Sequence, residues 1–164
     1  MLKTVLILFL AAALAACGSS PASWEAPLQQ PFVLTADVDG SFSGSVRFCY
    51  TTAENWSLEY LAPHAAAGLT ITKEAGRLTL AQGALKSSIS ADVLPQHSIF
   101  RVLCDAVTLC ACAVPQQQEN GVLLYSDSRL SVAVQNGVVQ QITDHAGGTV
   151  CRITGFMLQN APSD

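Results

Sequence analysis

The side chains with the widest chemical scope in this 164-residue chain are three histidines and six cysteines. His64, His97 and His145 are not spaced as metal ligands, either with one another or with a cysteine. We expect them to be ordinary surface residues in loops or at a helix start. The Cys110-Ala111-Cys112 segment lacks the two-residue spacer of redox and zinc motifs. The sequence therefore predicts no metal site and no cofactor.

Cys17 differs from the other cysteines because it ends a segment that is typical of a secretory signal. Lys3 precedes an apolar run from Val5 to Leu14, which is too short to span a bilayer. Leu14-Ala15-Ala16-Cys17 resembles the bacterial lipobox, in which the cysteine thiol receives a diacylglycerol and a peptidase cuts just before it. An ordinary secreted protein, cut after an Ala-x-Ala-like site, is the alternative. We expect residues 1–16 to be a signal peptide and a lipidated Cys17 to anchor the protein on the extracytoplasmic side of the cell membrane.

The remaining cysteines are odd in number, so they cannot all pair within one chain. They are Cys49, Cys104, Cys110, Cys112 and Cys151. We expect mostly buried free thiols that pack as small apolar residues. A single disulfide is the alternative, and Cys49 could reach Cys151 only if their strands are neighbours.

Motifs of catalysis are not recognisable in the sequence. The segment Gly40-Ser41-Phe42-Ser43-Gly44 has phenylalanine where a nucleophile elbow has its serine. Acidic residues fall singly, mostly at turns, and neither a phosphate-binding loop nor a dinucleotide fingerprint occurs. We therefore predict that the protein is not an enzyme, with an extracytoplasmic hydrolase as a minor alternative.

Composition limits the class of partner. The formal net charge is −4 and only 12% of the residues are charged, with scattered lysines and arginines, so we expect no nucleic-acid binding. Residues 17–31 are rich in proline and serine and are predicted to be a lipidated cysteine followed by a flexible tether. The folded domain is expected over residues 32–158, with a short tail at 159–164.

The elements of that domain follow from hydrophobic periodicity. Short runs of alternating apolar and polar residues, separated by turns such as Asp39-Gly40 and Asn136-Gly137, are typical of an antiparallel meander. Only the segment between Pro95 and Pro115 has the spacing of an amphipathic helix. Its apolar positions are Ile99, Val102, Leu103, Ala106, Cys110 and Ala113. The pattern predicts an α+β domain in which one helix covers a face of the sheet.

The order of these elements resembles the LolA/LolB-like bacterial lipoprotein superfamily, and in particular its Gram-positive, spore-former-associated branch. The resemblance is carried by Trp56-Ser57-Leu58-Glu59-Tyr60-Leu61-Ala62-Pro63, then Gly68-Leu69-Thr70-Ile71, then Leu94-Pro95. It implies a strongly curved antiparallel sheet, an unclosed half-barrel, with one amphipathic helix packed on its concave face. In members that deliver lipoproteins to the outer membrane, that concavity takes acyl chains.

Aromatic and aliphatic side chains on the concave face are the remaining candidates for a binding site. If register follows alternation, this face holds Phe48, Tyr50, Trp56, Leu58, Tyr60, Leu130, Val132 and Val134. They would either line a groove for an apolar ligand or form the core beneath the helix, and the core is the favoured interpretation. We expect a membrane-anchored lipoprotein that binds a protein partner or an apolar ligand. An acyl-chain carrier or acceptor of the Lol type is the alternative.

Overall fold

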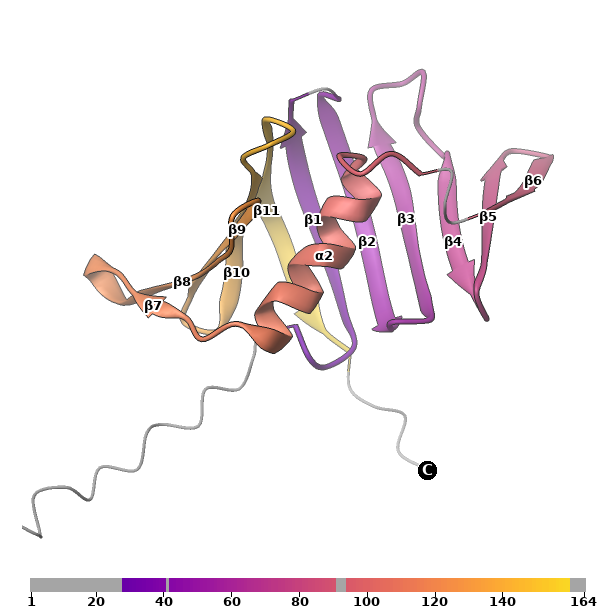
Figure 1. The fold of residues 1–164 in the computed structure, drawn as a ribbon. Helices are drawn as coiled ribbons and strands as arrows, with labels where there is room; N and C mark the ends of the chain where they lie inside the picture. Colours follow the sequence, from indigo (N-terminus) through magenta and orange to yellow (C-terminus); the bar gives the residue numbers. More distant parts are fainter. Residues whose placement is uncertain (1–27, 41, 91–93, 160–164) are drawn as a thin grey trace, which may run out of the picture.

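The structure, a computed structural model, describes residues 28–40, 42–90 and 94–159, and the predicted signal segment and Cys17 lie outside them. The described residues form eleven strands and one α-helix (Figure 1). The first six strands are β1 (Phe32–Asp39), β2 (Gly44–Thr52), β3 (Asn55–Ala62), β4 (Thr70–Glu74), β5 (Arg77–Gln82) and β6 (Leu85–Ile89). After them come the helix α2 (Ile99–Cys112), β7 (Gln116–Gln117), a 3-10 turn (Glu119–Gly121), β8 (Val122–Ser126), β9 (Leu130–Gln135), β10 (Val138–Asp144) and β11 (Thr149–Leu158).

All eleven strands belong to one antiparallel sheet with the order β6-β5-β4-β3-β2-β1-β11-β10-β9-β8-β7. Strands that are consecutive in the chain are neighbours, except for β6 and β7, which form the two edges of the sheet. The first and last strands, β1 and β11, pair with each other in the middle. The outer strands β6 and β7 do not pair, so the half-barrel-like sheet stays open, and α2 lies across its concave face (Figure 1). The predicted α+β fold class is confirmed.

The register in the centre of the sheet places the predicted apolar residues on one face. Phe32 in β1 lies opposite Tyr50 of β2 and Leu158 of β11. Across β2 and β3, Phe48 pairs with Leu58. Because side chains alternate along a strand, these pairs point in the same direction, toward α2.

The helix forms where its spacing predicts it, but it begins after Ser98 rather than at Pro95. The Ser98 side chain accepts a hydrogen bond from the backbone N–H of Arg101 (3.4 Å) and so satisfies one of the free amides of the first turn. Arg101 and Asp105, one turn apart on the helix, form an ion pair at 3.7 Å. At the other end, Cys112 closes the helix before Pro115, which cannot continue it.

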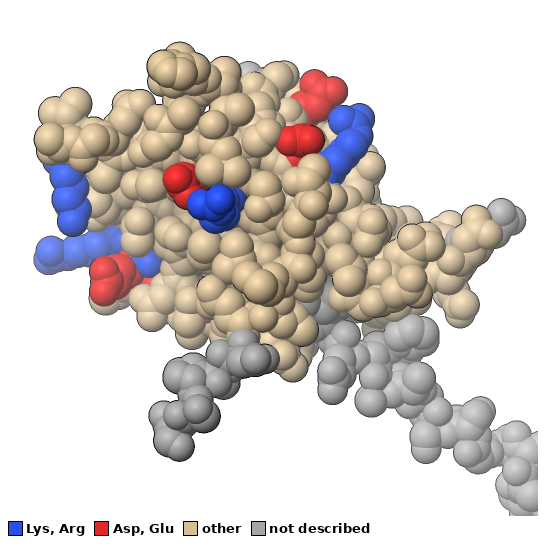
Figure 2. All heavy atoms as spheres, turned by 180° about the vertical axis from the view of Figure 1, so that it is seen from behind, with Lys and Arg blue, Asp and Glu red and all other residues tan. Residues whose placement is uncertain are grey.

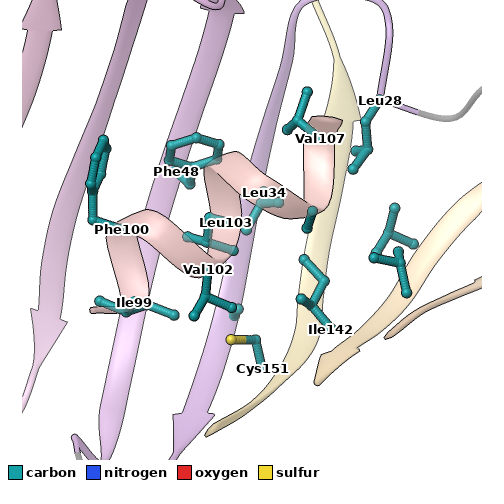
Figure 3. Packing of buried hydrophobic residues seen from close by; sticks show 14 of the residues in the cluster. Leu28, Leu34, Phe48, Ile99, Phe100, Val102, Leu103, Val107, Ile142 and Cys151 are labelled. Carbon is teal, nitrogen blue, oxygen red and sulfur yellow. The ribbon is translucent and has the colours of Figure 1, made fainter. Parts of the chain in front are cut away.

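The core lies between α2 and the sheet, and it holds side chains from both halves of the chain (Figure 3). Phe48, Leu58 and Val102 are fully buried there. Leu28, which the sequence analysis places in the tether, is only 1% exposed and lies near Val107 of the helix (Figure 3). The packed domain therefore includes Leu28.

Three strands do not follow a clear alternation in the sequence. β6 is polar and exposed over most of its length, β7 has two residues, and β8 opens with three half-buried apolar residues. All three lie at or next to an edge of the sheet, where pairing rather than burial holds a strand. Among the described residues, no helix has the length and apolar character needed to cross a bilayer.

Candidate apolar pocket between helix and sheet

A pocket of about 220 Å³ separates α2 from the strands on the β2–β5 side of the sheet. Its walls come from the β2–β3 hairpin, β4, β5, the segment before the helix and the helix itself. They are formed by Tyr50, Ala53, Trp56, Lys73, Leu78, Leu94, Phe100, Arg101, Cys104, Asp105, Val107 and Thr108. The volume is below the roughly 300 Å³ at which pockets for small-molecule ligands begin. It fits one large apolar side chain or a short part of a longer apolar chain.

The inner wall of the pocket is aromatic and aliphatic. The rings of Trp56 and Phe100 lie with their centroids 3.6 Å apart and their planes tilted by 35°. Leu78 is fully buried behind them. Because large rings present wide apolar surfaces with little conformational entropy to lose, such a wall favours an aliphatic or aromatic occupant.

The charged groups of the pocket are already paired within the protein. The Lys73 ammonium donates hydrogen bonds to the backbone carbonyl of Ala53 (2.9 Å) and to Oε1 of Glu54 (3.2 Å). On the helix, Arg101 is paired with Asp105. Lys73 and Arg101 thus each lie beside a carboxylate, although Asp105 is shared with Arg129. The chemistry of the pocket therefore favours an uncharged apolar group.

Two titratable side chains of the wall, Cys104 and Tyr50, are kept neutral. Burial raises the pKa of the Cys104 thiol to about 12, and the neighbouring Asp105 carboxylate adds to the shift. Burial also raises the pKa of Tyr50. A thiol that stays protonated at neutral pH is a poor nucleophile, so Cys104 contributes apolar surface to the pocket rather than reactivity.

The structure divides the eight residues predicted to share the concave face. Tyr50 and Trp56 line the pocket, whereas Tyr60 is half-buried elsewhere on β3 against Phe42 (centroids 5.1 Å apart). The other five are buried in the core: Phe48, Leu58, Leu130, Val132 and Val134. Five of the eight predicted residues therefore lie in the buried core beneath the helix.

The residues that sequence reasoning missed come mainly from the helix. Phe100, Cys104 and Val107 lie at spacings of four and three residues and line the pocket together. The predicted apolar stripe of the helix omits them, although their spacing marks a second stripe beside it. Lys73 and Leu78, from β4 and β5, have no signal in the sequence, because only the sheet register brings them to the helix.

A second, polar cluster lies on the other side of α2. Nδ1 of His97 is 2.8 Å from Oδ2 of Asp144, and because a carboxylate only accepts, the imidazole donates. Asp144 is fully buried, and its Oδ1 accepts the backbone N–H groups of Ala146 (3.2 Å) and Gly147 (3.1 Å). Burial alone would raise the pKa of Asp144, but the hydrogen bonds from His97 and these amides hold it below its ordinary value.

Close packing leaves no room in this cluster for a larger residue at Gly147. A Cβ there would lie 2.6 Å from Oδ2 of Asp144 and 2.8 Å from Cβ of His97. All three histidines are exposed, as expected from the sequence. His97 in addition joins the segment before the helix to the β10–β11 turn through Asp144.

The cysteines of the described residues are all free thiols. Cys49 on β2 and Cys151 on β11 are separated by β1, so their strands are not neighbours. Cys110 and Cys151 are buried, and burial raises the pKa of each to about 12. Within the described ranges, no three histidine, cysteine or acidic side chains gather closely enough to hold a metal ion.

Comparison with known proteins gives likenesses of structure alone. No protein-family model and no curated protein sequence matches the chain. An uncharacterized conserved protein from Thermus thermophilus has 12% sequence identity and a TM-score of 0.50, over 84% of this chain and 83% of its own. A LolA superfamily protein from Nitrosomonas europaea has 11% identity and a TM-score of 0.40, over 81% of this chain and 86% of its own. The first likeness shows a shared fold, whereas the second is too low to carry an argument, so the predicted superfamily and its Gram-positive branch stay predictions.

Proposed function

We propose that this protein is a membrane-anchored extracytoplasmic lipoprotein that acts by binding rather than catalysis. The pocket between α2 and strands β2–β5 would receive a large apolar side chain of a protein partner. The observation that carries this proposal is the 220 Å³ space with its wall of packed Trp56 and Phe100 rings. Such a pocket is of the kind in which an apolar anchor residue supplies most of an interface's affinity.

Size and charge both favour a side chain over a whole lipid. The pocket is smaller than typical ligand sites, and Lys73 and Arg101 each already contact a carboxylate, so an anionic headgroup would have to compete with that carboxylate. A carrier or acceptor of acyl chains in the Lol manner remains the alternative. It would require the pocket to lengthen along the helix.

Photo-crosslinking from the pocket tests the binding proposal and separates it from the alternative. Benzoylphenylalanine replaces Thr108, which lines the pocket, or Ala111, which is exposed on the same helix, in membranes of cells that make the lipidated protein. We expect a defined protein adduct from position 108, none from position 111, and loss of the adduct when Ala53→Phe fills the mouth. A lipid adduct at position 108 would favour the acyl-chain alternative, and equal protein adducts at both positions would contradict the pocket as the binding site.

The anchor is tested separately by Cys17→Ala. Because the lipobox thiol is the acylated atom, this variant should accumulate as unprocessed precursor or leave the membrane fraction, whereas Cys49→Ala, the matched control, should not. Metabolic labelling with an alkyne fatty acid reads out the acylation directly. Label that persists in the Cys17→Ala variant would show that the anchor lies elsewhere.

A further inference from the structure

Large hydrophobic side chains that remain exposed are concentrated at one end of the molecule. Among the described residues, they are Leu85, Val114, Val138, Met157 and Leu158. All except Leu85 lie at the end where β1 begins and β11 finishes, which we call the tether end. Met157 and Leu158 pair there with the first residues of β1. Val138 opens β10, and Val114 follows α2, both of which reach the same end in Figure 1. Leu85 opens β6 opposite Gln82, at the other end of the sheet.

The predicted lipid anchor is connected to the domain at this same end. The described chain starts at Leu28, which is buried near Val107 of the helix (Figure 3). Ten residues of chain separate Cys17 from Leu28, so the tether spans at most about 40 Å when extended. The acyl chains on Cys17 would therefore be connected to the domain at the tether end, within reach of its surface.

Charge is missing from four of the segments that build the tether end, whereas the β2–β3 and β4–β5 turns at the same end carry Glu54, Glu74 and Arg77. Residues 28–31, 112–118, 135–140 and 153–159 contain no Lys, Arg, Asp or Glu. They contribute apolar side chains together with glutamine, asparagine and small residues. Seen from behind in Figure 2, the lowest part of the described surface likewise shows no charged side chain. An uncharged surface with protruding apolar side chains avoids the desolvation cost that charged residues would pay at a lipid interface.

We propose that the tether end is a membrane-docking surface, on which Val114, Met157 and Leu158, with Val138 beside them, enter the interfacial layer of the bilayer that holds Cys17. This inference rests on the lipid anchor of the proposed function and goes beyond it, because an anchor alone leaves the domain free to rotate on its tether. Docking fixes one orientation. Tyr50 and Ala53 line the pocket, and Tyr50 pairs with Phe32 at the start of β1. This part of the pocket therefore lies at the tether end. In the docked protein, the pocket would face a partner that itself lies at the membrane.

Tryptophan quenching by brominated lipid tests the orientation in the full lipidated protein. The background variant is Trp24→Phe, which leaves Trp56 as the sole natural tryptophan, buried and common to all samples. Reporters are introduced as Met157→Trp and Val114→Trp at the tether end, and as Leu85→Trp at the opposite end. The last is the matched control, because Leu85 is 78% exposed and Met157 63%. Each protein is reconstituted into phosphatidylcholine vesicles with or without brominated acyl chains, and the Trp56 signal is subtracted.

We expect the reporters at positions 157 and 114 to be quenched several-fold more strongly than the reporter at position 85. Flotation of the same vesicles separates this inference from the anchor on which it rests. A protein that floats but shows equal quenching at all three positions, or stronger quenching at position 85, would overturn the docking and leave the anchor intact. A protein that does not float would overturn the anchor and the docking with it.

Discussion

The two sides of α2 are built differently. Toward β8–β11, polar contacts fix the helix: Arg129 pairs with Asp105 and donates to the carbonyl of Gln96 (3.3 Å), and His97 binds the buried Asp144. Toward β2–β5, the helix meets the sheet through the packed rings of Phe100 and Trp56, next to the open pocket. We call these the tied side and the open side.

Side-chain size gives a physical reason for the difference. On the tied side the helix turns the small Cys110 toward Tyr125 of β8, and small residues allow elements to approach closely. On the open side two large rings pack against each other and hold the helix away from the sheet. The comparison shows that hydrogen bonds and ion pairs can fix one side of a helix, while large side chains preserve a binding space on its other side.

The largest effect is expected from Trp56→Ala. Trp56 is 5% exposed, so its removal leaves a cavity and takes away the partner of Phe100, at a cost of about 3–5 kcal/mol in the free energy of unfolding. Urea unfolding followed by circular dichroism measures the loss. An unchanged unfolding midpoint would mean that Phe100 and Trp56 do not support the open side.

A matched pair of leucine truncations compares the two sides directly. Leu130→Ala removes a buried side chain of β9, and Leu78→Ala removes one that lines the pocket. We expect Leu130→Ala to cost about 2–5 kcal/mol and Leu78→Ala to fall near the lower end of that range, because Leu78 already lacks packing partners on its pocket side. The measurement is again urea unfolding. A larger loss for Leu78→Ala would contradict the contrast between a tied and an open side.

Asp144→Asn tests the buried hydrogen bonds that Asp144 accepts on the tied side. The amide cannot accept as a carboxylate does from His97, Ala146 and Gly147, so we expect a loss of about 1–3 kcal/mol near neutral pH. Asp127→Asn is the matched control. Its carboxylate also accepts two backbone amides, at the β8–β9 turn, but it is exposed, so the loss should be smaller.

The same variant has a defined pH dependence. The pKa of Asp144 is lowered in the folded protein, so its contribution is complete above the unfolded-state value of about 4 and declines as the pH falls through the folded-state pKa. The difference in stability between the natural protein and Asp144→Asn should therefore shrink as the pH is lowered from about 7 to about 3. A difference that grows over this range would contradict the charged tie.

The smallest effects are expected from the partly exposed ion pairs. Arg129→Gln on the tied side and Lys73→Gln on the open side each remove one such pair, and each should cost about 0.2–1 kcal/mol. Arg129→Gln should cost more, because its carboxylate partner Asp105 is less exposed (32%) than Glu54 (62%), the partner of Lys73. High salt should reduce both losses. Equal losses that do not respond to salt would show that neither pair stabilises the fold through its charge.

Much of the fold could be predicted from local signals. Alternation between Phe32 and Asp39 and the Asn136-Gly137 turn indicate strands and hairpins, since both depend on neighbouring residues. The start of the helix was placed too early, at Pro95, because the cap that decides it is the side chain of Ser98. The sequence pattern does not indicate β6. This strand is stabilised by pairing at the edge of the sheet, and its mostly exposed residues do not alternate between apolar and polar.

The candidate site was less predictable because it is made by contacts between distant segments. Tyr50 and Trp56 were among the predicted residues, but Leu78 and Phe100 join them only through the sheet order and the placing of the helix. His97 and Asp144 are 47 residues apart, so no spacing rule marks them as a pair. The lipidation of Cys17, by contrast, is predicted entirely from the local sequence and lies outside the described residues.

The most direct test of the account is a methyl NMR titration with toluene, an analogue of an apolar side chain that is small enough for the pocket. We predict chemical-shift changes at Leu78, Leu94 and Val107 on the open side, with Leu130, Val132 and Val134 unchanged in the packed core under β9. Absence of any shift, or equal shifts in the two groups, would contradict the claim that the open side of α2 is built to receive an apolar group.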